Sequence, residues 1–110
     1  MQFTVEELEA YLFDHYKSGG IDQSLFMKLV EEIGEVAEVL NKKAGGKQTD
    51  GGNLQTQLGS ELADVIHYAV AIAALNGIDI GKAIIEKDRT ASVKYNHRMS
   101  FEQFIAENRK

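Results

Sequence analysis

The sequence predicts an all-α protein of four-helix-bundle type. It contains no proline, and none of its segments shows the two-residue period of a β-strand. Residues 61–75 lack glycine and proline and are almost entirely apolar, which predicts a helix that is buried on most of its sides. Because 110 residues with 44% hydrophobic content can bury one modest core, we expect a single domain over residues 1–110.

Local signals bound the first two helices. The first is predicted to begin after Thr4, which fits a capping box with Glu7, and to end at the glycine pair that follows. The second is predicted to begin at Asp22 or Ser24 and to run to about Lys43. Its predicted apolar stripe consists of Phe26, Leu29, Ile33, Val36, Ala37 and Leu40.

Glycines and polar residues between 42 and 60 predict a loop that joins two helices of one domain. The third helix is predicted from Asn53 or Leu54 to the Asn-Gly pair at 76–77. It is apolar over most of its circumference, and a chain this short has too few other helices to cover it. We therefore expect a homo-oligomer, either a dimer or a tetramer, which completes the core and places the functional site near a subunit boundary.

The last part of the chain predicts two shorter helices. Asp79 is expected to cap a fourth helix that extends to about Ser92. Residues 94–98 are polar and cationic, and we expect them to be irregular. Ser100 fits a second capping box with Gln103. It opens a terminal helix whose inward residues are predicted to be Phe101, Phe104 and Ile105.

Two carboxylates stand near the start of the long apolar segment. Glu61 and Asp64 are three residues apart, so they share one face of the predicted helix. No Lys or Arg occurs between Lys47 and Lys82 to neutralise them. Because an unpaired carboxylate in an apolar setting is costly, a bound metal ion is the simplest partner. His67 lies off this face, and we expect it to be a hydrogen-bonded core histidine.

A second pair with the same spacing, Glu32 and Glu35, lies on the second helix. Two antiparallel helices that each present two carboxylates can close four oxygen ligands around a hard cation such as Mg²⁺. For the neighbouring Glu31 and Glu38, a solvated helix face is the simplest interpretation of the residues alone. The absence of cysteine excludes a thiolate metal site.

Composition also limits the partners. A net charge of −5 argues against a general nucleic-acid surface, which needs cationic stripes. The segment from Val65 to Leu75 is too short, and its flanks are too charged, to predict a membrane span. No secretion signal is recognised at the start, and the lack of cysteine fits a reducing compartment, so we expect a cytoplasmic protein without membrane or nucleic-acid partners.

The acidic residues form a two-part motif. Glu31, Glu32 and Glu35 give Glu-Glu-x-x-Glu; 25 residues (36–60) then separate it from Glu-x-x-Asp at Glu61 and Asp64. This motif resembles the signature of the MazG-like all-α nucleoside triphosphate pyrophosphohydrolases. The flanking sequences are also similar, and the resemblance extends from about residue 25 to residue 98.

The resemblance implies hydrolysis of a nucleoside triphosphate to a monophosphate and pyrophosphate. It implies that the reaction depends on Mg²⁺, for which Mn²⁺ can substitute, and that it serves nucleotide-pool housekeeping. Matched position by position, it implies four metal ligands: Glu32, Glu35, Glu61 and Asp64. It implies catalytic roles for Glu32 and for Glu31, which would orient or deprotonate the attacking water. The implied substrate-binding residues are Tyr68, Lys94, Asn96 and Arg98.

Three other interpretations stay open. Phosphoribosyl-ATP pyrophosphohydrolase of histidine biosynthesis has the same acidic scaffold. A di-iron carboxylate bundle is suggested by Asp64-x-x-His67, although that motif should occur on two helices. A helical interaction module with an acidic docking face would bind no divalent metal.

Overall fold

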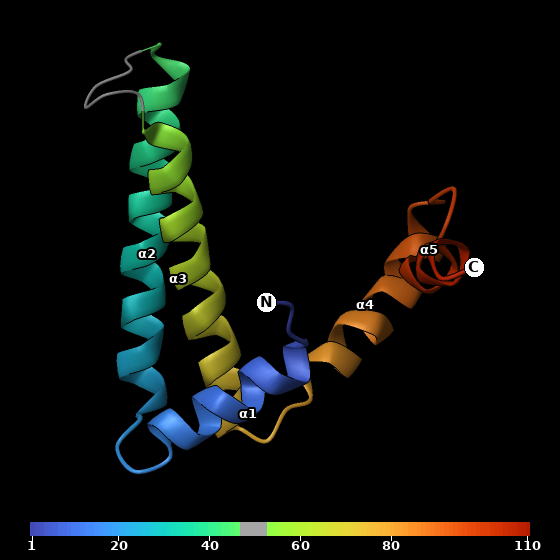
Figure 1. The fold of residues 1–110 in the computed structure, drawn as a ribbon, viewed down its shortest axis with the longest axis horizontal. Coiled ribbons are helices and arrows are strands. Elements are labelled where there is room, and N and C mark those ends of the chain that lie inside the picture. The colour runs from blue at the N-terminus through green and yellow to red at the C-terminus, as the bar shows by residue number, and fades with distance from the viewer. Residues whose placement is uncertain (47–52) are drawn as a thin grey trace.

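The computed structural model describes residues 1–46 and 53–110, and within these ranges it shows five helices and no strand (Figure 1). The all-α prediction is therefore confirmed. The middle of the predicted glycine-rich loop, residues 47–52, lies outside the described residues. The helices are α1 (Val5–Tyr16), α2 (Asp22–Ala44), α3 (Leu54–Leu75), α4 (Ile80–Lys94) and α5 (Phe101–Asn108).

The two long helices, α2 and α3, lie side by side as an antiparallel hairpin, and α1 crosses the end of the hairpin where α3 finishes (Figure 1). The core forms where these three helices meet. Leu12 of α1 is completely buried there, and it packs with Leu25, Val70 and Ala71. Tyr16, Tyr68 and Leu75 pack around this cluster and are partly buried. One end of the hairpin is therefore fixed by a third helix.

The predicted capping boxes are present at both ends of the chain. The Thr4 hydroxyl accepts a hydrogen bond from the Glu7 N–H, and the Glu7 carboxylate accepts one from the Thr4 N–H. Ser100 and Gln103 form the same reciprocal pair at the start of α5. The start of α2 differs, because Ile21 precedes it without a side-chain cap. These local signals fixed most of the predicted helix limits to within about two residues.

The hairpin presents an uncovered apolar face. Leu25 and Val39 of α2, which lie outside the predicted stripe, are buried. Three residues of that stripe, Phe26, Ile33 and Leu40, are instead 53%, 53% and 45% exposed. At about 100° per residue, the exposed residues of both antiparallel helices fall on the same side of the hairpin. We call this side the outer apolar face; it consists of Phe26, Val30, Ile33, Leu40, Leu62 and Ile66.

By length and composition alone, α3 could cross a membrane, since it has 22 residues and a mean hydropathy of 1.4 over its most apolar window. In this fold α3 is instead the central helix, which packs along α2 and beneath α1. Core helices of globular proteins commonly meet the same test, so α3 is weak evidence for a membrane span.

Helices α4 and α5 form an arm, residues 80–108, that projects away from the hairpin (Figure 1). Within it, Arg89 donates two hydrogen bonds to the Glu102 carboxylate, and Asp88 accepts one from the Phe101 N–H. The expected burial of Phe101 and Phe104 is wrong for the single chain, since they are 42% and 54% exposed. The reason is that, among the described helices, α5 packs mainly on α4.

Candidate metal centre

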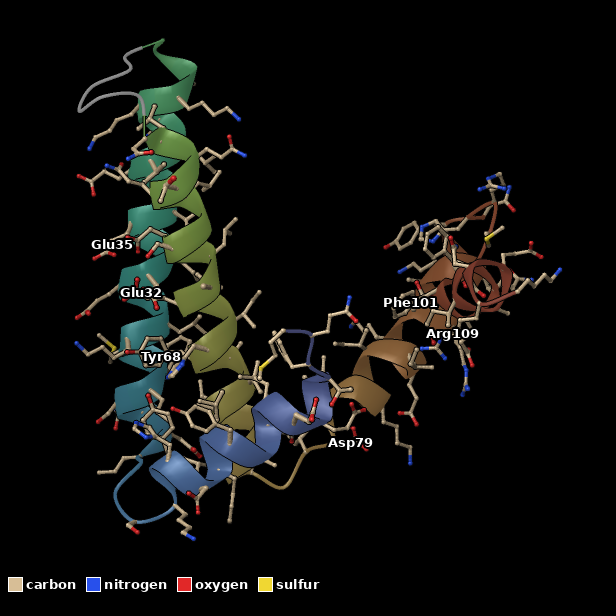
Figure 2. The ribbon with its side chains drawn as sticks, in the orientation of Figure 1. Glu32, Glu35, Tyr68, Asp79, Phe101 and Arg109 are labelled. Carbon is tan, nitrogen blue, oxygen red and sulfur yellow. The ribbon has the colours of Figure 1, made fainter. Side chains whose placement is uncertain are left out.

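Three carboxylates from the two long helices converge in the middle of the hairpin. Glu32 comes from α2, and Glu61 and Asp64 come from successive turns of α3. Each offers an oxygen, and the three oxygens lie within 4.8 Å of one another. We call these residues the acidic trio. Glu35 follows Glu32 by one turn on α2 (Figure 2), and it contacts Glu61 from outside the trio. All four residues predicted as ligands therefore lie close together.

Two oxygens of the trio are buried without a partner. Within the described residues, Oε2 of Glu32 and Oε2 of Glu61 are inaccessible to solvent and accept no hydrogen bond. The ion pairs formed by the described residues involve Asp14, Glu31, Glu102 and Glu107, and none includes the trio. Burying a carboxylate oxygen without a donor or a cation is unfavourable. The arrangement fits a hard divalent cation, which takes oxygen ligands.

The mutual repulsion of these carboxylates changes their protonation. The close approach of the Glu35 carboxylate, then of the Glu32 carboxylate, together with burial and the negative charge of both neighbours, raises the pKa of Glu61 to about 7. Contact with Glu61 lowers the pKa of Glu32, but burial and the charges of Glu35 and Asp64 outweigh it, so that this pKa is raised too. Without a cation, the group therefore tends to retain a proton near neutral pH.

Glu31 and the basic residues of the arm do not join the trio within one chain. The exposed Glu31 carboxylate lies 3.5 Å from the ammonium of Lys28. Lys94, Asn96 and Arg98 are exposed at the end of α4 and just beyond it, on the arm that leads away from the hairpin (Figure 1). There Lys94 lies over the ring of Tyr95, 5.3 Å from its centre, and Asn96 has a left-handed backbone with φ of 52°.

An aromatic group lies beyond the trio, toward α1. Tyr68 is half-buried next to the core (Figure 2), and its ring centre lies 4.9 Å from that of His67. His67 is half-buried and hydrogen-bonded as expected: its Nε2 lies 2.7 Å from the Tyr16 hydroxyl. Tyr16 was not predicted as a site residue. Its only signal in the sequence is its place four residues after Leu12, on the same side of the first helix.

Comparison with known proteins agrees with this geometry. The MazG nucleotide pyrophosphohydrolase domain matches residues 22–100. Proteins named dCTP pyrophosphatase 1 from Rattus norvegicus and Mus musculus are each 35% identical over 81 residues, which cover 71% of this chain and 48% of the relative. The chain thus spans about half the length of these curated relatives. Because the family match covers most of the chain, including the whole acidic trio, this chain belongs to the MazG nucleotide pyrophosphohydrolase domain family.

Proposed function

We propose that residues 1–110 form one domain that hydrolyses a nucleoside triphosphate, with Mg²⁺ or Mn²⁺, to a monophosphate and pyrophosphate. The observation that carries the proposal is the acidic trio with its two unpartnered buried oxygens, in a chain of the MazG family. In this reaction water is added across the α–β phosphoanhydride bond, and the released pyrophosphate carries the β and γ phosphates.

Four residues would hold the metal: Glu32, Glu35, Glu61 and Asp64. All four would offer carboxylate oxygens, which suits Mg²⁺ better than a di-iron centre, and three of them form the acidic trio. His67 is engaged by Tyr16 instead. When bound, Mg²⁺ would supply neutralisation of the triphosphate charge and activation of water. Glu31 would orient or deprotonate the attacking water, together with Glu32. The exposed Lys28–Glu31 ion pair is worth at most about 1 kcal/mol, so Glu31 can leave it at little cost.

The nucleotide would contact Tyr68 and three residues of the arm: Lys94, Asn96 and Arg98. The similarity to proteins named dCTP pyrophosphatase makes pyrimidine deoxynucleoside triphosphates the first substrates to test. We place the reaction in nucleotide-pool housekeeping in the cytoplasm. Support for the compartment is the absence of cysteine, and the net charge of −5 disfavours a nucleic-acid partner.

The working unit would be a homo-oligomer. The radius of gyration is 17.0 Å, whereas a compact domain of this length has one of about 13 Å. The chain exposes 8411 Å², which is about 2,400 Å² more than expected for a compact monomer of this size. One partner of a standard interface buries about 800 Å². The outer apolar face offers such a surface, and two hairpins that pack through it would complete a four-helix core.

Charge supports an arm that acts on a neighbouring subunit. Residues 1–79 contain five Lys or Arg and thirteen Asp or Glu, a net −8, whereas residues 80–110 contain seven and four, a net +3. In one chain the cationic arm points away from the acidic hairpin (Figure 1). Delivery of Arg98 and its neighbours to the acidic trio of a second copy would bring the opposite charges together, and would give the triphosphate its cationic partners.

A pyrophosphate-release screen with Mg²⁺ tests the function. The panel contains the common and damaged nucleoside triphosphates, dCTP among them, and phosphoribosyl-ATP as the competing substrate. We expect pyrophosphate from at least one nucleoside triphosphate and no turnover without a divalent metal. Release of orthophosphate and a diphosphate alone would contradict the proposal, and turnover of phosphoribosyl-ATP alone would assign the chain to histidine biosynthesis.

A further inference from the structure

One hydrogen bond connects α1 to α3, the helix that carries two residues of the acidic trio. The Tyr16 hydroxyl and His67 Nε2 are 2.7 Å apart, although the two residues are separated by 51 positions in the chain. Among the described residues, this is the one partly buried hydrogen bond between side chains of different helices. The two rings also meet edge to face, with their centres 5.7 Å apart. The contact therefore fixes both the distance and the orientation of the Tyr16 ring.

This contact lies directly beside the proposed metal centre. His67 follows Asp64 by three residues and precedes Tyr68, so Tyr68 lies about 6 Å further along the α3 axis than Asp64, toward α1. Burial raises the pKa of the Tyr16 phenol, and the proximity of Tyr68 raises it further, which agrees with two neighbouring phenols. Tyr16, His67 and Tyr68 thus form a continuous aromatic wall that begins one turn from the trio.

The sequence of the hairpin shows on which side of the acidic trio aromatic residues occur. Residues 27–66, which include the trio and the rest of the hairpin toward the loop, contain no Phe, Tyr, Trp or His. Bases stack favourably on aromatic rings. With the phosphates held at the trio, the nucleoside of a bound substrate finds aromatic surface within its own subunit on the α1 side alone.

We propose that His67 is a positioning residue, which holds the Tyr16 phenol beside Tyr68 so that the two rings form a preorganised wall for the nucleoside. The inference rests on the proposed function. A hydroxyl has one donor and two acceptor sites, and the bond to His67 uses one of them in either histidine tautomer. Tyr16 can therefore still bond a polar edge of the base or a sugar hydroxyl. Without His67, the ring would have to be ordered when substrate binds, which weakens binding.

Four variants test the role: His67→Phe, Tyr16→Phe, their combination, and His67→Gln, whose amide can replace Nε2. Tyr11→Phe is the matched control, because it removes an exposed hydroxyl from the same helix. We expect each single Phe variant to raise KM for the best triphosphate by about three- to tenfold, the typical worth of one hydrogen bond. The change in kcat should be smaller, and Mg²⁺ affinity measured by calorimetry should not change.

The combination supplies the decisive comparison. Loss of one shared bond predicts that the double variant has nearly the same KM as either single variant, whereas independent effects would multiply. His67→Gln should recover part of the lost KM, and Tyr11→Phe should behave as wild type. Variants that melt at a lower temperature but keep the wild-type KM would overturn the inference and leave His67 a purely structural residue. An inactive wild type would overturn the proposed function as well, so the two failures are distinguishable.

Discussion

At the scale of single residues, Glu61 combines a raised pKa with a buried oxygen that has no partner among the described residues. Its helix is predominantly apolar, and its carboxylate meets Glu32 and Glu35 from the neighbouring helix. These contacts raise its pKa to about 7, while an Oε2 atom remains buried without a partner. A group that is unfavourable for the fold by itself would become favourable once a cation bound, so the proposed metal site would link stability to metal binding at this position.

The pH dependence of stability without metal follows from Glu61. Its folded pKa of about 7 lies above the ordinary value of 4.5, so between these values the folded chain binds more protons than the unfolded chain. The free energy of unfolding should therefore fall as pH rises through this window. Urea unfolding in EDTA at several pH values measures this dependence. Glu61→Gln should flatten it, whereas Glu38→Gln, on an exposed part of α2, should not. An increase in stability from pH 5 to pH 7 that depends on Glu61 would contradict the assignment.

Substitution of a proposed metal ligand should have a larger effect than substitution of a nearby surface carboxylate. If Mg²⁺ binds the folded state selectively, as proposed, saturation at 100 times the dissociation constant should stabilise the wild type by about 2.7 kcal/mol. Glu32→Ala and Asp64→Ala should lose both activity and this stabilisation. Glu38→Ala should keep both nearly intact. Thermal melts with and without Mg²⁺ provide the measurement. If Glu38 were essential and Glu32 dispensable, the site would lie on the other side of α2 and the proposed ligand assignment would be wrong.

At the scale of elements, the helix caps were predicted correctly, whereas individual contacts between distant helices mostly could not be predicted. The capping boxes at Thr4 and Ser100 were predictable because each is contained in four consecutive residues. The all-α class and the family could be predicted too, and the spacing of acidic residues identified the trio that the structure brings together. The Tyr16–His67 contact could not be predicted, because nothing local joins residues 51 positions apart. The ligand and substrate roles themselves stay predictions.

The direction of the arm is likewise set by a non-local contact. The Glu9 carboxylate of α1 accepts a hydrogen bond of 3.1 Å from the Ile80 N–H at the start of α4, and Asp79 caps the same first turn by accepting a hydrogen bond from the Lys82 N–H. Gly81 leaves room for the neighbouring Glu6, whose carboxylate oxygen would lie 3.0 Å from an added Cβ. Nothing in the sequence around Ile80 indicates that α1 supplies a cap, so the position of Lys94 and Arg98 could not be predicted.

Substitution of Glu9 should loosen this junction. Glu9→Ala removes a partner from the first turn of α4 and should destabilise the protein by about 1 kcal/mol, the usual cost of a lost helix cap. Glu9→Gln keeps an acceptor oxygen on a side chain of the same length, so it should destabilise the protein less than Glu9→Ala. Thermal denaturation gives the stability, and hydrogen exchange of the Ile80 amide reports the junction itself. Equal protection of that amide in the wild type and in Glu9→Ala would show that the contact does not hold the arm.

At the scale of the whole molecule, the open shape and the separated charges point to the same assembly. The outer apolar face lies on the side of the hairpin opposite Glu31, Glu35 and Glu38, so pairing through it would leave the acidic side accessible. The cationic arm extends beyond its own hairpin, where it can reach a neighbour (Figure 1). Both features are unfavourable in a solitary chain, and the proposed symmetric oligomer would explain them together.

The outer apolar face should control assembly. Ile66 is 55% exposed in the single chain, so Ile66→Glu should leave the fold of the protomer intact but place a charge in the interface. Light scattering at micromolar concentration should then show a shift toward the protomer mass of 12.2 kDa, with loss of activity. Ile21→Glu is the matched control, since Ile21 is 63% exposed and lies outside this face. A wild type that is active and monomeric would contradict the predicted assembly.

Complementation between two inactive variants tests whether the arm acts on a neighbouring subunit. Asp64→Ala removes a proposed metal ligand from the hairpin, and Arg98→Ala removes a proposed phosphate contact from the arm. If each site combines the trio of one protomer with the arm of another, a mixed dimer regains one site in which both residues are intact. Random pairing of equal amounts makes half of the dimers mixed, so co-refolded variants should recover about a quarter of the wild-type activity. If the arm instead reaches the trio of its own chain, no mixed dimer contains an intact site, and the mixture should stay as inactive as its components.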